Sequence, residues 1–144
     1  MTEAFTLAGT YIHLNPDGSA RAMEGGDRFW AGIAERHDLD QGWLMGATGQ
    51  SKDWDHWERH PAGDEILTLL SGEMELVLDA PGGEQRAVLK AGQTFIVPRG
   101  IWHRAIVKEP GQLMFLTPGA GTEHKPVTTS RDQAVFTGQG AAPI

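Results

Sequence analysis

The chain has 144 residues, 40% of them hydrophobic and 22% charged, which suits a single globular domain with its own core. A net charge of −7, with no cluster of Lys and Arg, argues against a nucleic-acid-binding surface. The sequence contains no cysteine, so disulfides, thiolate chemistry and cysteine-based zinc sites are excluded.

The N-terminal part carries weak strand signals. Residues 5–14 predict a strand that ends in a turn at residues 15–18, Asn-Pro-Asp-Gly. Asp27 is expected to cap a short helix over residues 28–36, whose apolar side chains fall on one side. Residues 43–47 predict a further strand.

A clear β pattern follows in the middle of the chain. Met74, Leu76 and Leu78 alternate with acidic residues, as in a strand with one buried face. Glycines and prolines separate this strand from other short ones, which are predicted at residues 66–70, 86–90, 94–97, 102–107 and 113–116. Short, evenly spaced strands of this kind indicate an antiparallel barrel or sandwich.

We therefore expect one domain in three parts. Residues 1–51 form N-terminal strands and a short helix, residues 52–118 form the barrel core, and residues 119–144 form an extended C-terminal tail. Within the tail, Glu123 and His124 are expected to lie in an exposed loop. The N-terminus lacks the basic region followed by an apolar region that is typical of a signal peptide. No apolar stretch is long enough to span a membrane, so a cytoplasmic protein is expected.

Two segments contain histidines and carboxylates that could bind a metal or take part in catalysis. In the later one, GQTFIVPRGIWH, Gly92 opens a strand, Pro98 closes it and Gly100 permits a sharp turn. Two strands joined in this way can direct His103 into a barrel interior. This histidine is therefore a candidate functional residue.

The earlier segment, WDHWERHPAGDEILTLLSG, places several polar side chains on one face of an extended strand. The residues that share this face are Trp54, His56, Glu58 and His60. After a turn, Asp64 and Glu65 enter the next strand on opposite faces, so only one of them can point inward with His60. Two imidazoles and a carboxylate that converge make a site for a divalent metal.

Both segments resemble the two motifs of the cupin family, over roughly residues 54–118. The later segment matches the pattern G-x5-P-x-G-x2-H at Gly92, Pro98, Gly100 and His103, although Val107 stands where the family has a final Asn. The earlier segment matches the pattern H-x-H-(three or four residues)-E-x6-G in part, at His60, Glu65 and Gly72, with four residues before the Glu. Glu58 occupies the position of the first histidine.

The resemblance implies an all-β fold, a double-stranded β-helix or jelly-roll barrel with at most one short helix. It also implies the metal ligands His60, Glu65 and His103. Glu58 either binds the metal as a second carboxylate, acts on substrate as an acid or base, or marks a site that has lost its metal affinity. Asp64 is the alternative to Glu65, and His56, farther out on the same face, is a further candidate.

Two functions fit this pattern. The first is a metal-dependent enzyme of the oxygenase, isomerase or lyase type that acts on a small organic molecule, with Glu58 as a catalytic base. Its cofactor would be a divalent transition metal, Fe, Mn, Zn or Ni. The second is a barrel that binds or senses a small ligand without turnover. The resemblance also implies a homodimer, and neither nucleic acid nor membrane is an expected partner.

Overall fold

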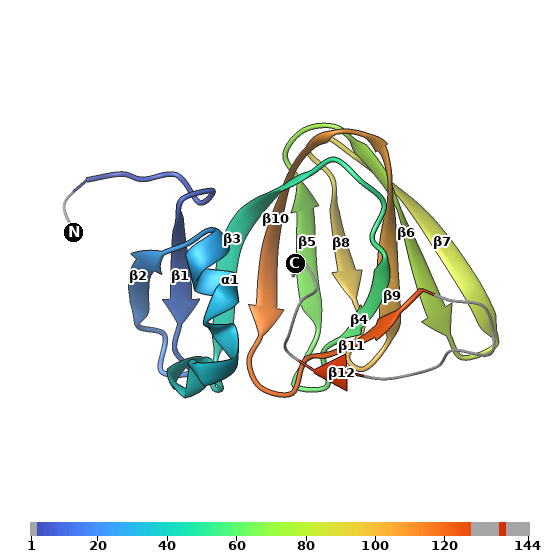
Figure 1. Ribbon diagram of the computed structural model, residues 1–144. Helices are drawn as coiled ribbons and strands as arrows, with labels where there is room; N and C mark the ends of the chain where they lie inside the picture. Colours follow the sequence, from blue (N-terminus) through green and yellow to red (C-terminus); the bar gives the residue numbers. More distant parts are fainter. Residues whose placement is uncertain (1–2, 128–135, 138–144) are drawn as a thin grey trace.

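The computed structural model describes residues 3–127 and 136–137, which form two antiparallel sheets that face each other (Figure 1). The first sheet contains β1 (Thr10–Leu14), β2 (Ala20–Glu24), β3 (Trp43–Gln50), β5 (Glu65–Leu69), β8 (Thr94–Val97) and β10 (Gly111–Pro118), in the order β2-β1-β3-β10-β5-β8. The second contains β4 (His56–Arg59), β6 (Glu73–Ala80), β7 (Gly83–Lys90), β9 (Trp102–Glu109), β11 (Glu123–Pro126) and β12 (Phe136–Thr137), in the order β12-β11-β4-β9-β6-β7. The all-β, jelly-roll expectation is confirmed.

The core lies between the sheets and follows the predicted alternation. The inward side chains of β6 are buried, as expected for Met74, Leu76 and Leu78. They face buried side chains of β5 and β10, which are Leu67, Leu69, Leu113 and Phe115. Burial alternates along β1, β4 and β5, so every second side chain of these strands points inward.

The N-terminal part differs from the expectation in its element boundaries. The first strand begins at Thr10 instead of residue 5, because the backbone N–H groups of Gly9 and Thr10 both bond to the Thr6 carbonyl and form a turn. The strand β2 has no counterpart in the prediction. Its residues alternate little in polarity, and pairing with β1 holds it in place.

The predicted helix is shorter than expected and its predicted cap is wrong. The helix α1 spans Asp27–Ala31, and Gly26, with φ of 94°, occupies the N-cap position without any side-chain hydrogen bond. Two 3-10 turns follow, η1 (Ile33–Glu35) and η2 (His37–Leu39). None of the helices in residues 3–127 is long and apolar enough to cross a membrane.

The C-terminal segment adds a strand to the second sheet. Strand β11 pairs with β4 at four positions, from Glu123 opposite Arg59 to Pro126 opposite His56. The expected extended tail therefore begins as part of the sheet. Its residues 128–135 and 138–144 lie outside the described residues.

Close aromatic packing joins the N-terminal strands to the barrel. The Tyr11 ring contacts Phe115 edge-on, with centroids 5.6 Å apart, and Phe29 of α1 at 5.1 Å. Gly46 of β3 leaves the space for these rings, since a Cβ there would lie 2.5 Å from Tyr11 Cδ1 and 2.7 Å from Phe115 Cζ. The absence of a side chain at this position is thus a packing requirement.

Replacing Gly46 by Ala should lower the free energy of unfolding by about 1–3 kcal/mol, because two buried rings would have to move. Gly49→Ala, in the same strand, is the matched control. A Cβ at Gly49 would lie 3.5 Å from its nearest neighbour, Gln112 Nε2, which is ordinary contact. Denaturant unfolding of both variants makes the comparison, and equal losses would contradict this account.

Candidate metal centre

A single row of side chains across the second sheet forms one side of the cluster. In the antiparallel register, Glu58 of β4 lies opposite His103 of β9 and, on its other side, opposite His124 of β11. Residues directly opposite one another point to the same face of a sheet. All three side chains therefore point into the barrel, where their exposed fractions are 0%, 0% and 6%.

The facing sheet supplies the second carboxylate. Glu65, the first residue of β5, is fully buried, whereas its neighbour Asp64 is exposed and accepts a hydrogen bond from the Arg99 backbone N–H at 2.8 Å. Because the two side chains point in opposite directions, Asp64 stays outside the cluster. Thr117 of β10 donates a hydrogen bond of 2.6 Å to Glu65 Oε2 and fixes the orientation of the carboxylate.

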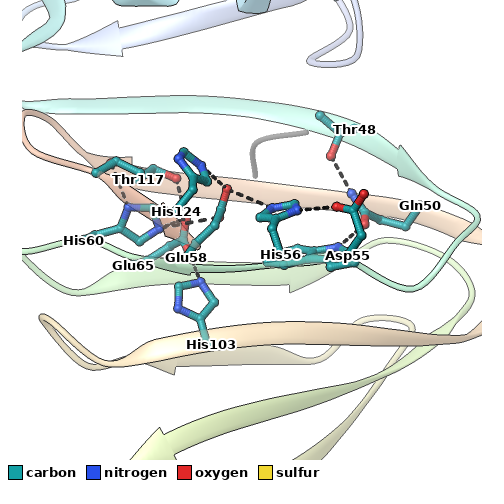
Figure 2. A network of polar contacts seen from close by, with 12 residues as sticks. Thr48, Gln50, Asp55, His56, Glu58, His60, Glu65, His103, Thr117 and His124 are labelled. Carbon is teal, nitrogen blue, oxygen red and sulfur yellow. Dashed lines mark hydrogen bonds and ion pairs between the residues drawn. The ribbon is translucent and has the colours of Figure 1, made fainter. Parts of the chain in front are cut away.

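The two carboxylates and the imidazoles come into close contact (Figure 2). Glu65 Oε1 lies 3.1 Å from His103 Nε2, and Glu65 Oε2 lies 3.2 Å from His60 Nε2. Glu58 Oε2 lies 3.9 Å from His60 Nε2. The sequence predicted this group of four residues, and the structure brings all of them together.

The hydrogen bonds on the outer side of each ring determine which nitrogen faces the cluster. His103 Nδ1 lies 3.1 Å from the Ile101 carbonyl oxygen, which can only accept, so Nδ1 carries the proton. In a neutral His103, Nε2 is then a bare lone pair. His60 Nδ1 lies 3.0 Å from Thr122 Oγ1, which leaves its Nε2 facing the carboxylates in the same way.

Four buried atoms point at one another without forming hydrogen bonds. Within the described residues, no hydrogen-bond partner exists for Glu58 Oε2, His60 Nε2, Glu65 Oε1 or His103 Nε2. Lone pairs of a neutral imidazole and of a carboxylate repel at such distances unless a proton or a cation lies between them. Nitrogen and oxygen donors of this kind suit a divalent transition metal, so the residues fit the ion that the cupin motifs imply.

The pKa values of Glu58, Glu65 and His60 also describe the charges within the cluster. Burial alone would raise the pKa of Glu65, but the charge on His60 and close contacts with His103 and His60 lower it to about 2. Burial likewise opposes ionisation of Glu58, yet the hydrogen bond from His124 and the contact with His56 lower its pKa. The pKa of His60 is raised, since the charges of Glu65 and Glu58 and the close contact with Glu65 together outweigh the effect of burial. Both carboxylates therefore favour the ionised form, because positive charge on the neighbouring imidazoles, or on a cation in their place, stabilises it.

A second buried group meets the first at Glu58. His56, Glu58 and His124 place one donor atom each within 4.8 Å of the others, as do Glu58, His60 and His103. One divalent cation would neutralise the two carboxylates of the whole cluster, and a second would leave a buried excess of positive charge. Charge balance therefore assigns hydrogen-bonding roles to His56 and His124. His124 Nε2–H donates to Glu58 Oε1 at 2.9 Å, and His56 Nε2 lies 3.5 Å from the same oxygen.

Sequence reasoning missed His124. We expected it in an exposed loop, but its exposed fraction is 6%, so that expectation is wrong. A strand over residues 122–126 would have placed Thr122 and His124 on one face and Glu123 on the other. Glu123 does point outward, where it pairs with Arg59 at 2.9 Å. The glycine-rich sequence before the strand hid this alternation.

A cavity of about 210 Å³ opens beside the cluster. Glu58, His60 and His124 line one part of it, and the rest of its lining comes from residues 30–44, among them Trp30 and Ile33, and from residues 117–122. The cluster can therefore be reached from this side by a small molecule.

The comparison with known families matches residues 46–118 to the cupin domain. The chain belongs to the cupin family. A curated relative, the uncharacterized protein YdbB of Bacillus subtilis (strain 168), is 42% identical over 48 residues, which are 33% of this chain and 40% of that protein. The chain thus matches two fifths of the length of this relative.

Two solved structures are similar to this cupin in part. A cupin-2 domain containing protein from Shewanella frigidimarina NCIMB 400 is 21% identical, with a TM-score of 0.46 over 53% of this chain and 70% of that one. Hydroquinone 1,2-dioxygenase from Sphingomonas sp. TTNP3, solved with 4-hydroxybenzoate bound, is 18% identical, with a TM-score of 0.45 over 54% of this chain and 60% of that one.

Strand β11 should control metal affinity, because Thr122 orients His60 and His124 orients Glu58. Thr122→Val and His124→Leu are each expected to weaken metal binding by roughly 10–100-fold, as lost partners of ligands do. Thr122→Ser and His124→Gln keep a hydrogen-bonding group and should restore much of it. Titration against a chelator of known affinity measures the change.

The control for these variants is Glu123→Gln, on the opposite face of the same strand. It weakens the outer ion pair with Arg59 without touching the cluster, so metal affinity should stay unchanged. If Glu123→Gln weakened metal binding as much as His124→Leu, the side-chain hydrogen bonds would have no special role.

Proposed function

We propose that this cupin is a metal-dependent enzyme that acts on a small organic molecule, with Glu58, His60, Glu65 and His103 as the ligands of a divalent transition metal. The observation that carries this proposal is the convergence of four buried donor atoms that have no hydrogen-bond partner among the described residues. Such atoms are costly to bury unless something compensates them. A bound cation compensates all four at once.

Each residue has a distinct part in this proposal. Glu65 and His103 form the inner end of the cluster and are fully buried. Glu58 and His60 lie at the boundary with the cavity, where a substrate would meet them. A divalent metal would supply Lewis acidity or oxygen activation there. Two histidines with carboxylates form the donor type of non-haem iron oxygenases, so oxygenase chemistry is the reaction type to test first.

The surroundings of the site support binding of an organic molecule. Thr122 places its hydroxyl group beside His60 in the lining of the cavity, where it can hydrogen-bond an oxygen of the substrate, whereas the Thr117 hydroxyl already donates to Glu65. Apolar side chains of the lining, among them Trp30 and Ile33, can contact the organic part of the molecule. The same arrangement also suits a binding barrel without turnover, which the measurements below distinguish by metal content and oxygen consumption.

His60→Ala and His103→Ala should each abolish stoichiometric binding of Fe, Mn, Ni or Zn by tag-free protein, because each removes a proposed ligand. His37→Ala is the control, since the His37 side chain is 81% exposed and remote from the cluster. Elemental analysis after reconstitution measures the metal content. Wild-type protein that took up no metal would exclude the proposal.

The neighbouring carboxylates of Asp64 and Glu65 allow a second comparison of metal binding. Glu65→Gln should greatly weaken binding, whereas Asp64→Asn should leave it unchanged, because Asp64 points outward. In wild-type protein, free metal about a hundredfold above its Kd should raise the free energy of unfolding by about 2.7 kcal/mol. Equal effects of the two substitutions would contradict the inward orientation of Glu65.

Glu58→Gln tests the position where the family pattern has histidine. As a proposed ligand, Glu58 should be worth more than the roughly 10–100-fold in metal affinity that an outer hydrogen-bond partner contributes. Metal content and oxygen consumption with small phenols and keto acids should then fall together. If metal content survived and turnover alone collapsed, Glu58 would act on substrate instead of on the metal.

A further inference from the structure

The cavity beside the cluster has two chemically different ends. At the inner end lie Glu58, His60, His124 and two threonine hydroxyls. The outer part is walled by the side chains of Trp30, Ile33, Leu39 and Leu44. An occupant that fills both ends needs an oxygen-bearing head and an apolar body.

The size of the cavity limits that body. Its volume is about 210 Å³. An enclosed apolar cavity of about 150 Å³ is known to hold one benzene molecule. A single ring with a few substituents, or an aliphatic group of similar bulk, therefore fits.

The charged residues in the lining further limit which molecules the cavity can bind. Arg36 is the one Lys or Arg side chain in the described lining, and it already binds Asp38 through two contacts of 2.9 and 3.0 Å. Its guanidinium also lies 5.5 Å from the centre of the Phe29 ring. Asp40, another lining residue, adds negative charge at the rim. An anionic group on the outer end of a ligand would find no free cation there.

We propose that the cavity binds a molecule of one-ring size with no anionic group at its outer end, its oxygen-bearing head at Glu58, His60 and Thr122 and its apolar body against Trp30 and Ile33. This inference rests on the proposed function, because the oxygen-bearing head approaches the proposed metal ligands. It goes further by excluding substrates that carry a carboxylate at the end remote from the cluster.

Two probes with the same head separate these alternatives. Catechol is neutral, and 3,4-dihydroxybenzoate carries an added carboxylate on the far side of the ring. Zinc-loaded protein, whose metal content is measured first, is titrated with each probe by calorimetry under nitrogen. Catechol should bind at least roughly tenfold more tightly, since the added carboxylate would be left unpaired against an apolar wall.

Substitutions at Ile33 locate the probe. Ile33→Trp fills the apolar end and should weaken catechol binding at least roughly tenfold, while zinc content stays unchanged. Ala31→Trp, at an exposed position outside the lining, is the control of equal bulk and should have no effect. Ile33→Lys introduces a cation into the wall and should shift the preference toward 3,4-dihydroxybenzoate.

The outcomes distinguish the two proposals. Failure to take up zinc would exclude the proposed metal function, and this inference with it. Zinc uptake without catechol binding, equal binding of both probes, or catechol binding that Ile33→Trp leaves unchanged would each exclude this inference alone. Tighter binding of catechol that depends on Ile33 would support it.

Discussion

Two buried carboxylates held among imidazoles between the sheets are the constraint on which the site depends. Glu58 comes from one sheet and Glu65 from the other, and both are fully buried. Ionised groups of this kind are tolerated only when positive charge or hydrogen bonds compensate them. His124 beside Glu58 and Thr117 beside Glu65 each hydrogen-bond one oxygen of a carboxylate, and the cross-strand row of Glu58, His103 and His124 positions the remaining donor atoms.

Glutamate at position 58 changes the electrostatics of the cupin pattern. A histidine there would leave Glu65 as the one carboxylate of the predicted ligand set, whereas Glu58 adds a second negative charge. Two carboxylates balance one divalent cation in charge, and the imidazoles of His56 and His124 lie 3.5 and 2.9 Å from Glu58 Oε1, on the side away from His60 and His103. Glutamate at position 58 and histidine at position 124 are thus related, because the buried Glu58 carboxylate requires the hydrogen-bond donor that His124 Nε2 provides at 2.9 Å.

Different parts of the chain supply the cluster and the cavity. The segment 46–118, which matches the cupin domain, contains the four proposed ligands. The apolar wall comes from Trp30 to Leu44, and the hydrogen bonds that orient Glu58 and His60 come from β11. If the cluster binds metal and the wall contacts the ligand, as proposed, residues outside the family core decide which molecule binds.

The sequence by itself predicted the barrel and the inward placement of Glu58, His60 and His103, because the alternation of side chains and the spacing of glycines, Pro98 and His103 are local signals. It left Asp64 and Glu65 as alternatives and assigned His124 to an exposed loop. Only the tertiary structure decided these points. The entry of β5 into its sheet directs Glu65 inward, and pairing of β4 with β11 brings together Glu58 and His124, which lie 66 positions apart in the chain. Cross-strand register depends on long-range pairing, and a shift of one residue would reverse every side chain.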